Sequence, residues 1–224
     1  MNIFVLDSSP LLAAQQQCDK HVVKMIVESA QMLSTAHRLL DGKVRVVERF
    51  NADTGKTRKA KIWLLDDKRL DADLYAAVHT GHPCTIWTME SLANYLWHYQ
   101  HFVALCDEYT HRYGKKHATD TKLRLVLDQA PDRIPDIGPT QFKLAMKSNP
   151  ECMNPADPVA SYRAFYRTKQ SRFKMVWSKR TAPDWFTAME IKRYTKQQVI
   201  NFSKKNVATD DYAFSERSGG YTVT

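Results

Sequence analysis

One continuous amphipathic pattern, between Cys18 and Leu40, constrains the fold of this chain more than any other feature. Apolar or small residues recur there with the 3.6-residue period of a helix that packs one face on a core. They are Val22, Met25, Ile26, Ser29, Leu33, Ala36 and Leu40. A polar stripe runs beside them and consists of His21, Lys24, Glu28, Gln31 and Thr35.

The polar stripe has two interpretations. Residues seven apart lie on one side of a helix, so His21 and Glu28 share a side with Lys24 between them. The column is then either a solvated face, with Lys24 and Glu28 as an ordinary surface ion pair, or the wall of an active site.

The rest of the chain predicts a mainly α, compact helical domain over residues 1–186, followed by a basic, polar and partly flexible C-terminal extension, 187–224. The 224 residues suffice for one sizeable core. The expected elements are a short buried strand at 1–7, a helix at about 10–40, a β-hairpin insertion at 43–65, a short helix at 66–77, a long helix at 85–113, a Pro-rich wrap at 129–158 and a helix from Pro158.

The cysteines and the hydropathy indicate a cytoplasmic protein. Cys18, Cys84, Cys106 and Cys152 form no C-x-x-C pair, so we expect reduced, structural thiols and no zinc site. No apolar run approaches the ~20 residues that span a bilayer, and the first residues lack the pattern of a signal peptide. We therefore expect no membrane association.

The net charge of +9 is concentrated in one block. Residues 160–206 hold 12 Lys or Arg and 2 acidic residues, interleaved with aromatic residues. Cations for phosphates and rings for stacking favour a DNA-binding surface, although a solvated Lys-rich helix pair would also fit. The candidate DNA-binding residues are Arg163, Arg167, Lys169, Arg172, Lys174, Lys179 and Arg180.

The long helix at 85–113 repeats the arrangement of the first one. A turn with His79, Gly81, His82 and Pro83 opens it. Its expected core stripe is Met89, Leu92, Leu96, Val103 and Cys106, and a second stripe contains Glu90, Asn94, Trp97 and His101. The candidate substrate-binding residues are Lys20, Gln31, His82, Trp87, Glu90, Asn94 and Trp97; His82 could instead cap the helix, and the Trp residues could belong to the core.

The available groups favour a reaction without metal or cofactor. No P-loop, dinucleotide-binding or H-E-x-x-H pattern occurs, and the adjacent His-Asp ligands of a metal phosphohydrolase are missing. Removal of a base from DNA needs a carboxylate, for which Glu28 is the candidate, assisted by His21. An amine nucleophile could be Lys20, Lys24 or the α-amino group of Met1.

The order of these features resembles the phage-type pyrimidine-dimer DNA glycosylases, the endonuclease V-like family of small helical enzymes. The matching features are His21 and Glu28 on the first long helix, Gly81-His82 before the second, an Ile134-Pro135 loop and the aromatic-basic segment 161–167. The chain is also similar to tailed-phage proteins of unassigned function that begin with a comparable strand and a Cys-Asp-Lys-His segment.

The resemblance implies a DNA glycosylase with AP-lyase activity that flips a damaged or modified base out of the stack. Glu28 would be the catalytic carboxylate, His21 would help to form the site, and the N-terminal α-amine would be the nucleophile. Asn2, the lack of an early basic residue, the insertion 43–65 and the tail after Trp177 depart from the family pattern. A phage DNA-base hypermodification transferase and a non-catalytic DNA-binding protein therefore remain alternatives, and a monomer is favoured.

Overall fold

The computed structural model describes residues 1–187. The chain divides into two units, Met1–Pro183 and Asp184–Thr224. Only the short helix α8 (Asp184–Thr187) of the second unit is described, so the predicted extension 187–224 lies outside the described residues apart from Thr187. No described helix is both long and apolar enough to cross a membrane.

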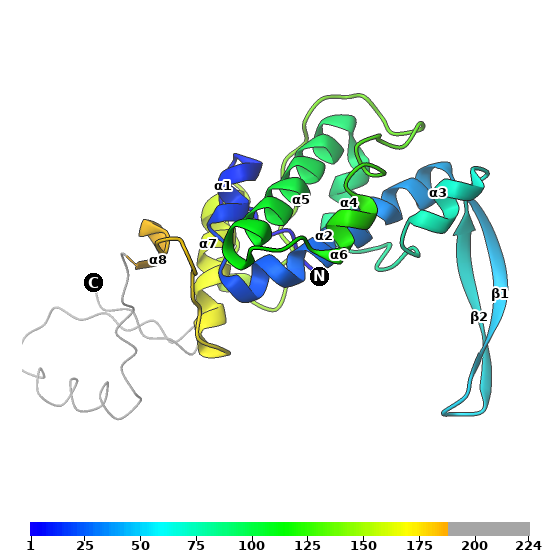
Figure 1. The fold of residues 1–224 in the computed structure, drawn as a ribbon, viewed down its shortest axis with the longest axis horizontal. Coiled ribbons are helices and arrows are strands. Elements are labelled where there is room, and N and C mark those ends of the chain that lie inside the picture. Colours follow the sequence, from blue (N-terminus) through cyan, green and yellow to red (C-terminus); the bar gives the residue numbers. More distant parts are fainter. Residues whose placement is uncertain (188–224) are drawn as a thin grey trace, which may run out of the picture. The chain divides into compact units, whose positions relative to one another are not determined.

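The first unit is mainly α, as predicted, with a single two-stranded hairpin among its described elements (Figure 1). In chain order its elements are α1 (Pro10–Gln15), α2 (Asp19–Asp41), β1 (Lys43–Asn51), β2 (Lys56–Leu64), α3 (Lys68–Asp73), α4 (Pro83–Glu90), α5 (Leu92–Tyr113), α6 (Ala118–Leu123), the 3₁₀ turn η1 (Pro150–Cys152), α7 (Pro158–Arg167) and the 3₁₀ turn η2 (Thr168–Ser171).

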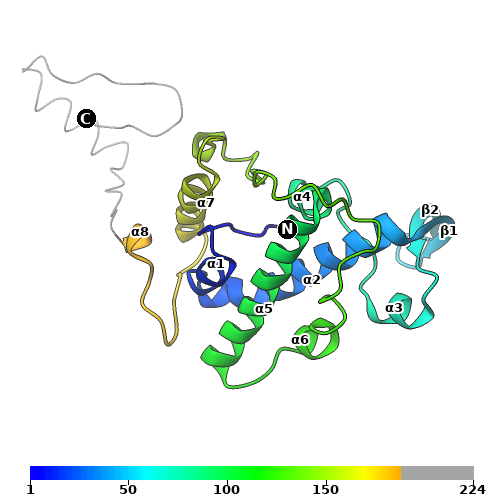
Figure 2. The ribbon, with the colours of Figure 1, turned by 90° about the horizontal axis from the view of Figure 1, so that it is seen from above.

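Helix α2 is the central element, and its predicted core stripe is confirmed. Val22, Ile26 and Leu33 are fully buried where α2 packs against α4 and α5 (Figure 2). The predicted helix over 10–40 is nevertheless two helices. The chain is extended at Cys18, whose backbone N–H donates to the Tyr166 hydroxyl instead of to a helix carbonyl.

The predicted helix over 85–113 is also divided, because Ser91 is extended and caps α5 through its hydroxyl. The backbone N–H of Leu92 donates to the carbonyl of Pro135 in the Pro-rich wrap. The predicted core stripe is only partly confirmed, because Cys106 is buried but Met89, Leu92 and Val103 are half-buried. Leu96 is 39% exposed, whereas the buried residues include Asn94, Tyr95, His98, His101 and Phe102.

The N-terminal segment is buried, but the predicted strand at 1–7 is wrong. Ile3, Val5 and Leu6 are buried, yet no strand pairs with them. Phe4 has φ 54°, a left-handed conformation that interrupts an extended run, and its N–H donates to the Asn2 side chain. From Met1 the segment passes between α4 and α7 and leads into α1 (Figure 2).

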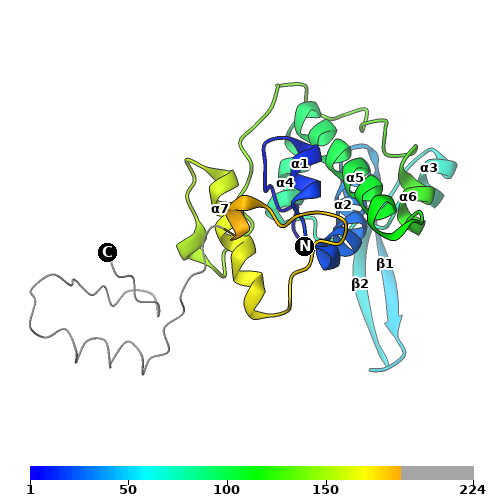
Figure 3. The same ribbon diagram turned by 60° about the vertical axis from the view of Figure 1, so that its left-hand side comes forward.

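The other predicted segments agree with the structure. The hairpin at 43–65 forms β1 and β2, which extend away from the end of α2 (Figures 1 and 3). The wrap at 129–158 contains no α-helix or strand, only the turn η1. Helix α7 begins at Pro158 with Asp157 as its cap. Helix α6 was not predicted.

Candidate functional site

The carboxylate of Glu28 lies among three nitrogen atoms. The backbone N–H of Asn2 donates to Oε2 at 2.9 Å, and the Met1 nitrogen lies 3.7 Å from the same oxygen. Lys24 Nζ lies 3.2 Å from Oε1. The side chain of Glu28 is only 12% exposed, whereas that of Lys24 is 65% exposed. A carboxylate that is largely shielded from water therefore lies within ion-pair distance of the N-terminal nitrogen.

Asn2 holds the N-terminus in this position. Its side-chain amide donates to the carbonyl of Ala145, and its Oδ1 accepts the N–H of Phe4. The side chain of Met1 is 3% exposed, and the hydroxyl of Thr85 contacts its sulfur at 4.0 Å. The N-terminus is thus fixed by α2, α4 and the Pro-rich wrap together, which no local spacing in the sequence indicates.

His21 is buried beside this carboxylate as a neutral ring. Its Nδ1 lies 2.8 Å from the Tyr166 hydroxyl, which also accepts the Cys18 N–H at 2.8 Å. Burial lowers the pKa of His21 to about 4, and nearby lysines act in the same direction. Phe4 stacks on the ring at 4.8 Å.

A pocket of about 480 Å³ brings these groups together. Met1, His21 and Glu28 line it, as does the ring of Phe173. Its cationic side chains are Lys20 and Lys24 from α2, Lys169 from η2, and Arg172, which follows η2. The pKa of Lys169 is lowered by burial and then by Arg172. The pocket therefore contains one carboxylate, the N-terminal nitrogen and four cationic side chains.

His82 lies near the N-terminus but does not line the pocket. Its Nδ1 caps α4 by accepting the N–H of Cys84. Burial first, then the charge of the Met1 amine, lowers the pKa of His82. The capping role that was the alternative for His82 is therefore present.

Most of the other predicted substrate-binding residues lie outside the pocket, and three of them hydrogen-bond to the Pro-rich wrap. Trp87 is 2% exposed and donates to the Thr140 carbonyl, and Asn94 donates to the Thr140 hydroxyl. Glu90 accepts from that hydroxyl and pairs with Lys143. Trp87, Glu90 and Asn94 lie on either side of the break at Ser91, and all three contact the wrap. Trp97 donates to the Ser8 carbonyl, and Gln31 is half-buried elsewhere on α2.

The predicted DNA-binding block is divided between the pocket and structural contacts. Lys169 and Arg172 line the pocket. Arg163 donates to the carbonyl of Leu6 and pairs with Asp7 at 3.3 Å. Lys174 is exposed, and Arg167 is half-buried at the end of α7.

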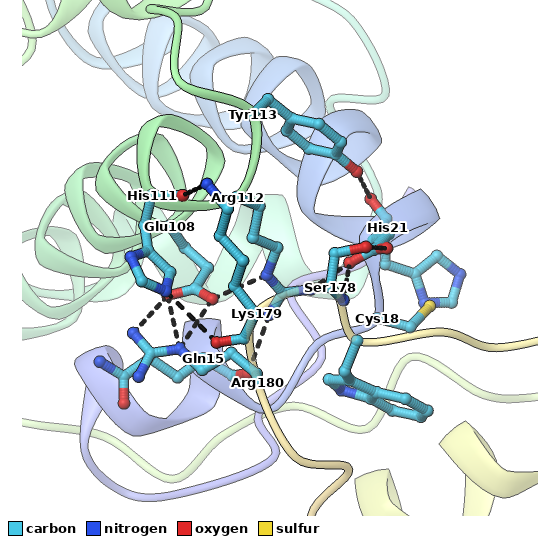
Figure 4. A network of polar contacts seen from close by, with 12 residues as sticks. Gln15, Cys18, His21, Glu108, His111, Arg112, Tyr113, Ser178, Lys179 and Arg180 are labelled. Carbon is cyan, nitrogen blue, oxygen red and sulfur yellow. Dashed lines mark hydrogen bonds and ion pairs between the residues drawn. The ribbon is translucent and has the colours of Figure 1, made fainter.

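The last two members of the block are exposed and contact residues of α5 (Figure 4). Arg180 pairs with Glu108 at 2.8 Å, and Lys179 donates to the His111 carbonyl. Arg112, whose side chain is fully buried, joins Glu108 to Asp19 at the start of α2. These contacts hold the segment 176–180 against α2 and α5, and the expected role of Lys179 and Arg180 in DNA binding stays a prediction.

The four cysteines are free and buried, as predicted. Within residues 1–187 no three His, Cys, Asp or Glu side chains are grouped so that they could hold a metal ion. The residues that sequence reasoning missed are Asn2, Ala145 and Ser148. Phe173 was noted only as one aromatic residue of the basic block. No family model, curated protein or solved structure matches this chain.

Proposed function

We propose that this protein is a DNA base-excision enzyme, a DNA glycosylase with AP-lyase activity that acts on a damaged or modified pyrimidine. The observation that carries the proposal is the pocket in which the Met1 nitrogen lies 3.7 Å from the Glu28 carboxylate, beside neutral His21. The proposed enzyme acts as a monomer in the cytoplasm, that of the host if a phage encodes it.

Glu28 supplies the negative charge that this reaction needs. As the bond between C1′ and the base nitrogen breaks, positive charge develops on the sugar, and a carboxylate fixed before the reaction stabilises it. Hydrogen bonding to Asn2 N–H and pairing with Lys24 hold the carboxylate in place. A pocket that is partly closed to water strengthens this interaction.

The α-amino group of Met1 is the proposed nucleophile. In its neutral form its lone pair attacks C1′, and the base leaves with the electrons of the glycosidic bond and one proton from the amine. The C1′–O4′ bond then breaks, O4′ takes up the second amine proton, and an imine joins C1′ to the Met1 nitrogen. Lys24 is largely exposed and paired with Glu28, which favours the role of a balancing cation. Lys169 is a second amine of the pocket, with a lowered pKa.

The remaining pocket residues suit a nucleotide that is turned out of the duplex. Lys20, Lys169 and Arg172 provide positive charge for flanking phosphates. The ring of Phe173 offers a face for an extruded base, although Lys20 Nζ lies 4.6 Å from its centroid in this structure. The neutral ring of His21 also lines the pocket and offers a ring nitrogen for hydrogen bonding.

Glu28→Gln tests the function directly. The amide keeps an acceptor for Asn2 N–H but removes the charge, so base release is expected to fall by at least about 100-fold, the magnitude of removing one electrostatic stabiliser. Release of free base from damaged or modified duplex DNA is the measurement. Duplex binding, measured separately, is expected to remain near that of the wild type.

Glu90→Gln is the matched control, because Glu90 is the corresponding carboxylate of the second polar stripe and does not line the pocket. It should retain base release. Full activity in Glu28→Gln would refute the assignment. A changed DNA mass without free base would instead identify a hypermodification transferase. DNA binding that depends on the cations alone, with no reaction, would identify a non-catalytic protein.

A further inference from the structure

The hairpin β1–β2 is a long ribbon for which the core provides no reason. Its two strands of nine residues each pair antiparallel, and none of these residues is buried. The ribbon projects from the end of α2 in both side views (Figures 1 and 3). Val47, Ala60, Ile62, Trp63 and Leu64 are half-buried and the other strand residues are exposed. A two-stranded hairpin with so little covered surface is at best marginally stable, so its length is better explained by a ligand than by the stability of the domain.

The positive charge of the ribbon is concentrated on one face. Cross-strand partners share a face, and the register pairs Arg45 with Ile62, Arg49 with Arg58 and Asn51 with Lys56. We call this the basic face; its charged residues are Lys43, Arg45, Arg49, Lys56 and Arg58, and it has no acidic residue. The opposite face is mixed, with Glu48 facing Lys59 and Val46 facing Lys61.

The pair Arg49–Arg58 indicates an anionic ligand most directly. Both side chains are exposed, they are directly opposite each other, and neither has a salt bridge within the described residues. Like charges in this position destabilise a hairpin. Lys43, near the base of the ribbon, is paired with Asp66. An anion between the two guanidinium groups would remove the repulsion, and a phosphate accepts their donors in the required geometry.

We propose that the ribbon is a second DNA-binding element, whose basic face enters the major groove of a duplex and contacts its phosphates. The inference rests on the proposed function only in taking DNA as the ligand. A major groove about 12 Å wide admits a two-stranded ribbon. On the mixed face, lysines lie among the exposed residues Val44, Val46 and Phe50. This face therefore lacks the continuous apolar surface that a protein interface would use.

The spacing along α2 allows one duplex to reach both elements. Lys43 lies fifteen positions after Glu28, and most of the residues between them belong to α2. At about 1.5 Å per helical residue the ribbon begins about 20 Å from the carboxylate, or about six base pairs of a duplex. The ribbon would then hold undamaged DNA to one side of the nucleotide in the pocket and lengthen the contacted site.

The test compares two double variants that remove the same charge from opposite faces. Arg49→Gln/Arg58→Gln alters the basic face, and Lys59→Gln/Lys61→Gln alters the mixed face. Binding to an undamaged 20-base-pair duplex is measured by fluorescence anisotropy at several salt concentrations. The first variant is expected to bind about tenfold more weakly and to lower the salt slope by about two, because two phosphate contacts are lost. The second should bind nearly as the wild type does.

Equal effects of the two variants, or no effect of the first, would overturn the inference. An equal loss with a single strand of the same length would exclude groove entry, and a change in oligomeric state on gel filtration would make the ribbon a protein interface. Binding needs no base release. Ribbon-dependent binding without any reaction would therefore refute only the proposed function, and base release with ribbon-independent binding would refute only this inference.

Discussion

Glu28 is bonded to the backbone of Asn2 and lies near the Met1 nitrogen and Lys24. Such a carboxylate could serve only to anchor the N-terminus. Two observations at the residue scale favour chemistry as well. The carboxylate and the amine both line a pocket, and the neighbouring histidine is kept neutral because burial lowers its pKa to about 4. Phe4, stacked on that histidine, has a left-handed backbone conformation that costs about 1–3 kcal/mol, as is common at functional sites.

The buried histidines predict a loss of stability in acid. Burial lowers the pKa of His21 and of His37 to about 4 and that of His101 to about 3, against 6.5 for the unfolded chain. The unfolded chain therefore takes up protons first as the pH falls below 6.5. The free energy of unfolding is expected to fall between pH 6.5 and 4, by up to about 1.4 kcal/mol per pH unit for each histidine.

His21→Gln isolates one of these contributions, because an amide can still accept the Tyr166 hydroxyl. The variant should show a shallower dependence of the free energy of unfolding on pH between 6.5 and 4, measured by urea denaturation. A slope identical to that of the wild type would mean that His21 is not buried in its neutral form.

At the scale of elements, α2 carries the candidate site at one end and the ribbon at the other. The start of α2 is fastened by the ion network of Asp19, Glu108, Arg112 and Arg180 (Figure 4). The same network holds the segment 176–180, which follows the pocket residues Lys169, Arg172 and Phe173 in the chain. The network therefore fixes the C-terminal end of the segment 169–180, whose first residues line the pocket.

Glu108→Gln should destabilise the first unit strongly. The side chain of Glu108 is 2% exposed and pairs with two arginines, so its neutralisation removes one carboxylate partner from the fully buried Arg112, which keeps Asp19, and the pairing of Arg180. The expected loss is about 3–5 kcal/mol of unfolding free energy. Asp66→Asn is the matched control, because Asp66 pairs with Lys43 at the surface; it should change the value by less than about 1 kcal/mol. Similar losses for the two variants would contradict the structural role of the network.

At the scale of the whole molecule, periodic and local signals predicted the fold well. The stripe of Val22, Ile26 and Leu33 defined α2, and the Gly, Pro and Asn residues marked the hairpin and the wrap. The breaks at Cys18 and Ser91 could not be predicted. They depend on hydrogen bonds to Tyr166 and to Pro135, which lie far along the chain, and no Gly or Pro marks either position.

The candidate site was predictable only in part, for the same reason. Helical spacing places His21, Lys24 and Glu28 on one side of α2. It does not bring Met1 to Glu28, because that contact depends on Asn2 bonding to Ala145. The ribbon was recognised as a hairpin but not as a basic surface. Its seven Lys or Arg against two acidic residues are offset in the whole-chain balance by acidic residues elsewhere.

Trapping the covalent intermediate tests the central claim most directly. Wild-type protein is incubated with abasic duplex DNA and borohydride, which reduces an imine to a stable amine, and the adduct is digested and mapped by mass spectrometry. We predict a single adduct on the peptide that begins with Met1, attached through its α-amino group. An adduct on Lys24, Lys169 or another lysine, or no adduct at all, would contradict this assignment.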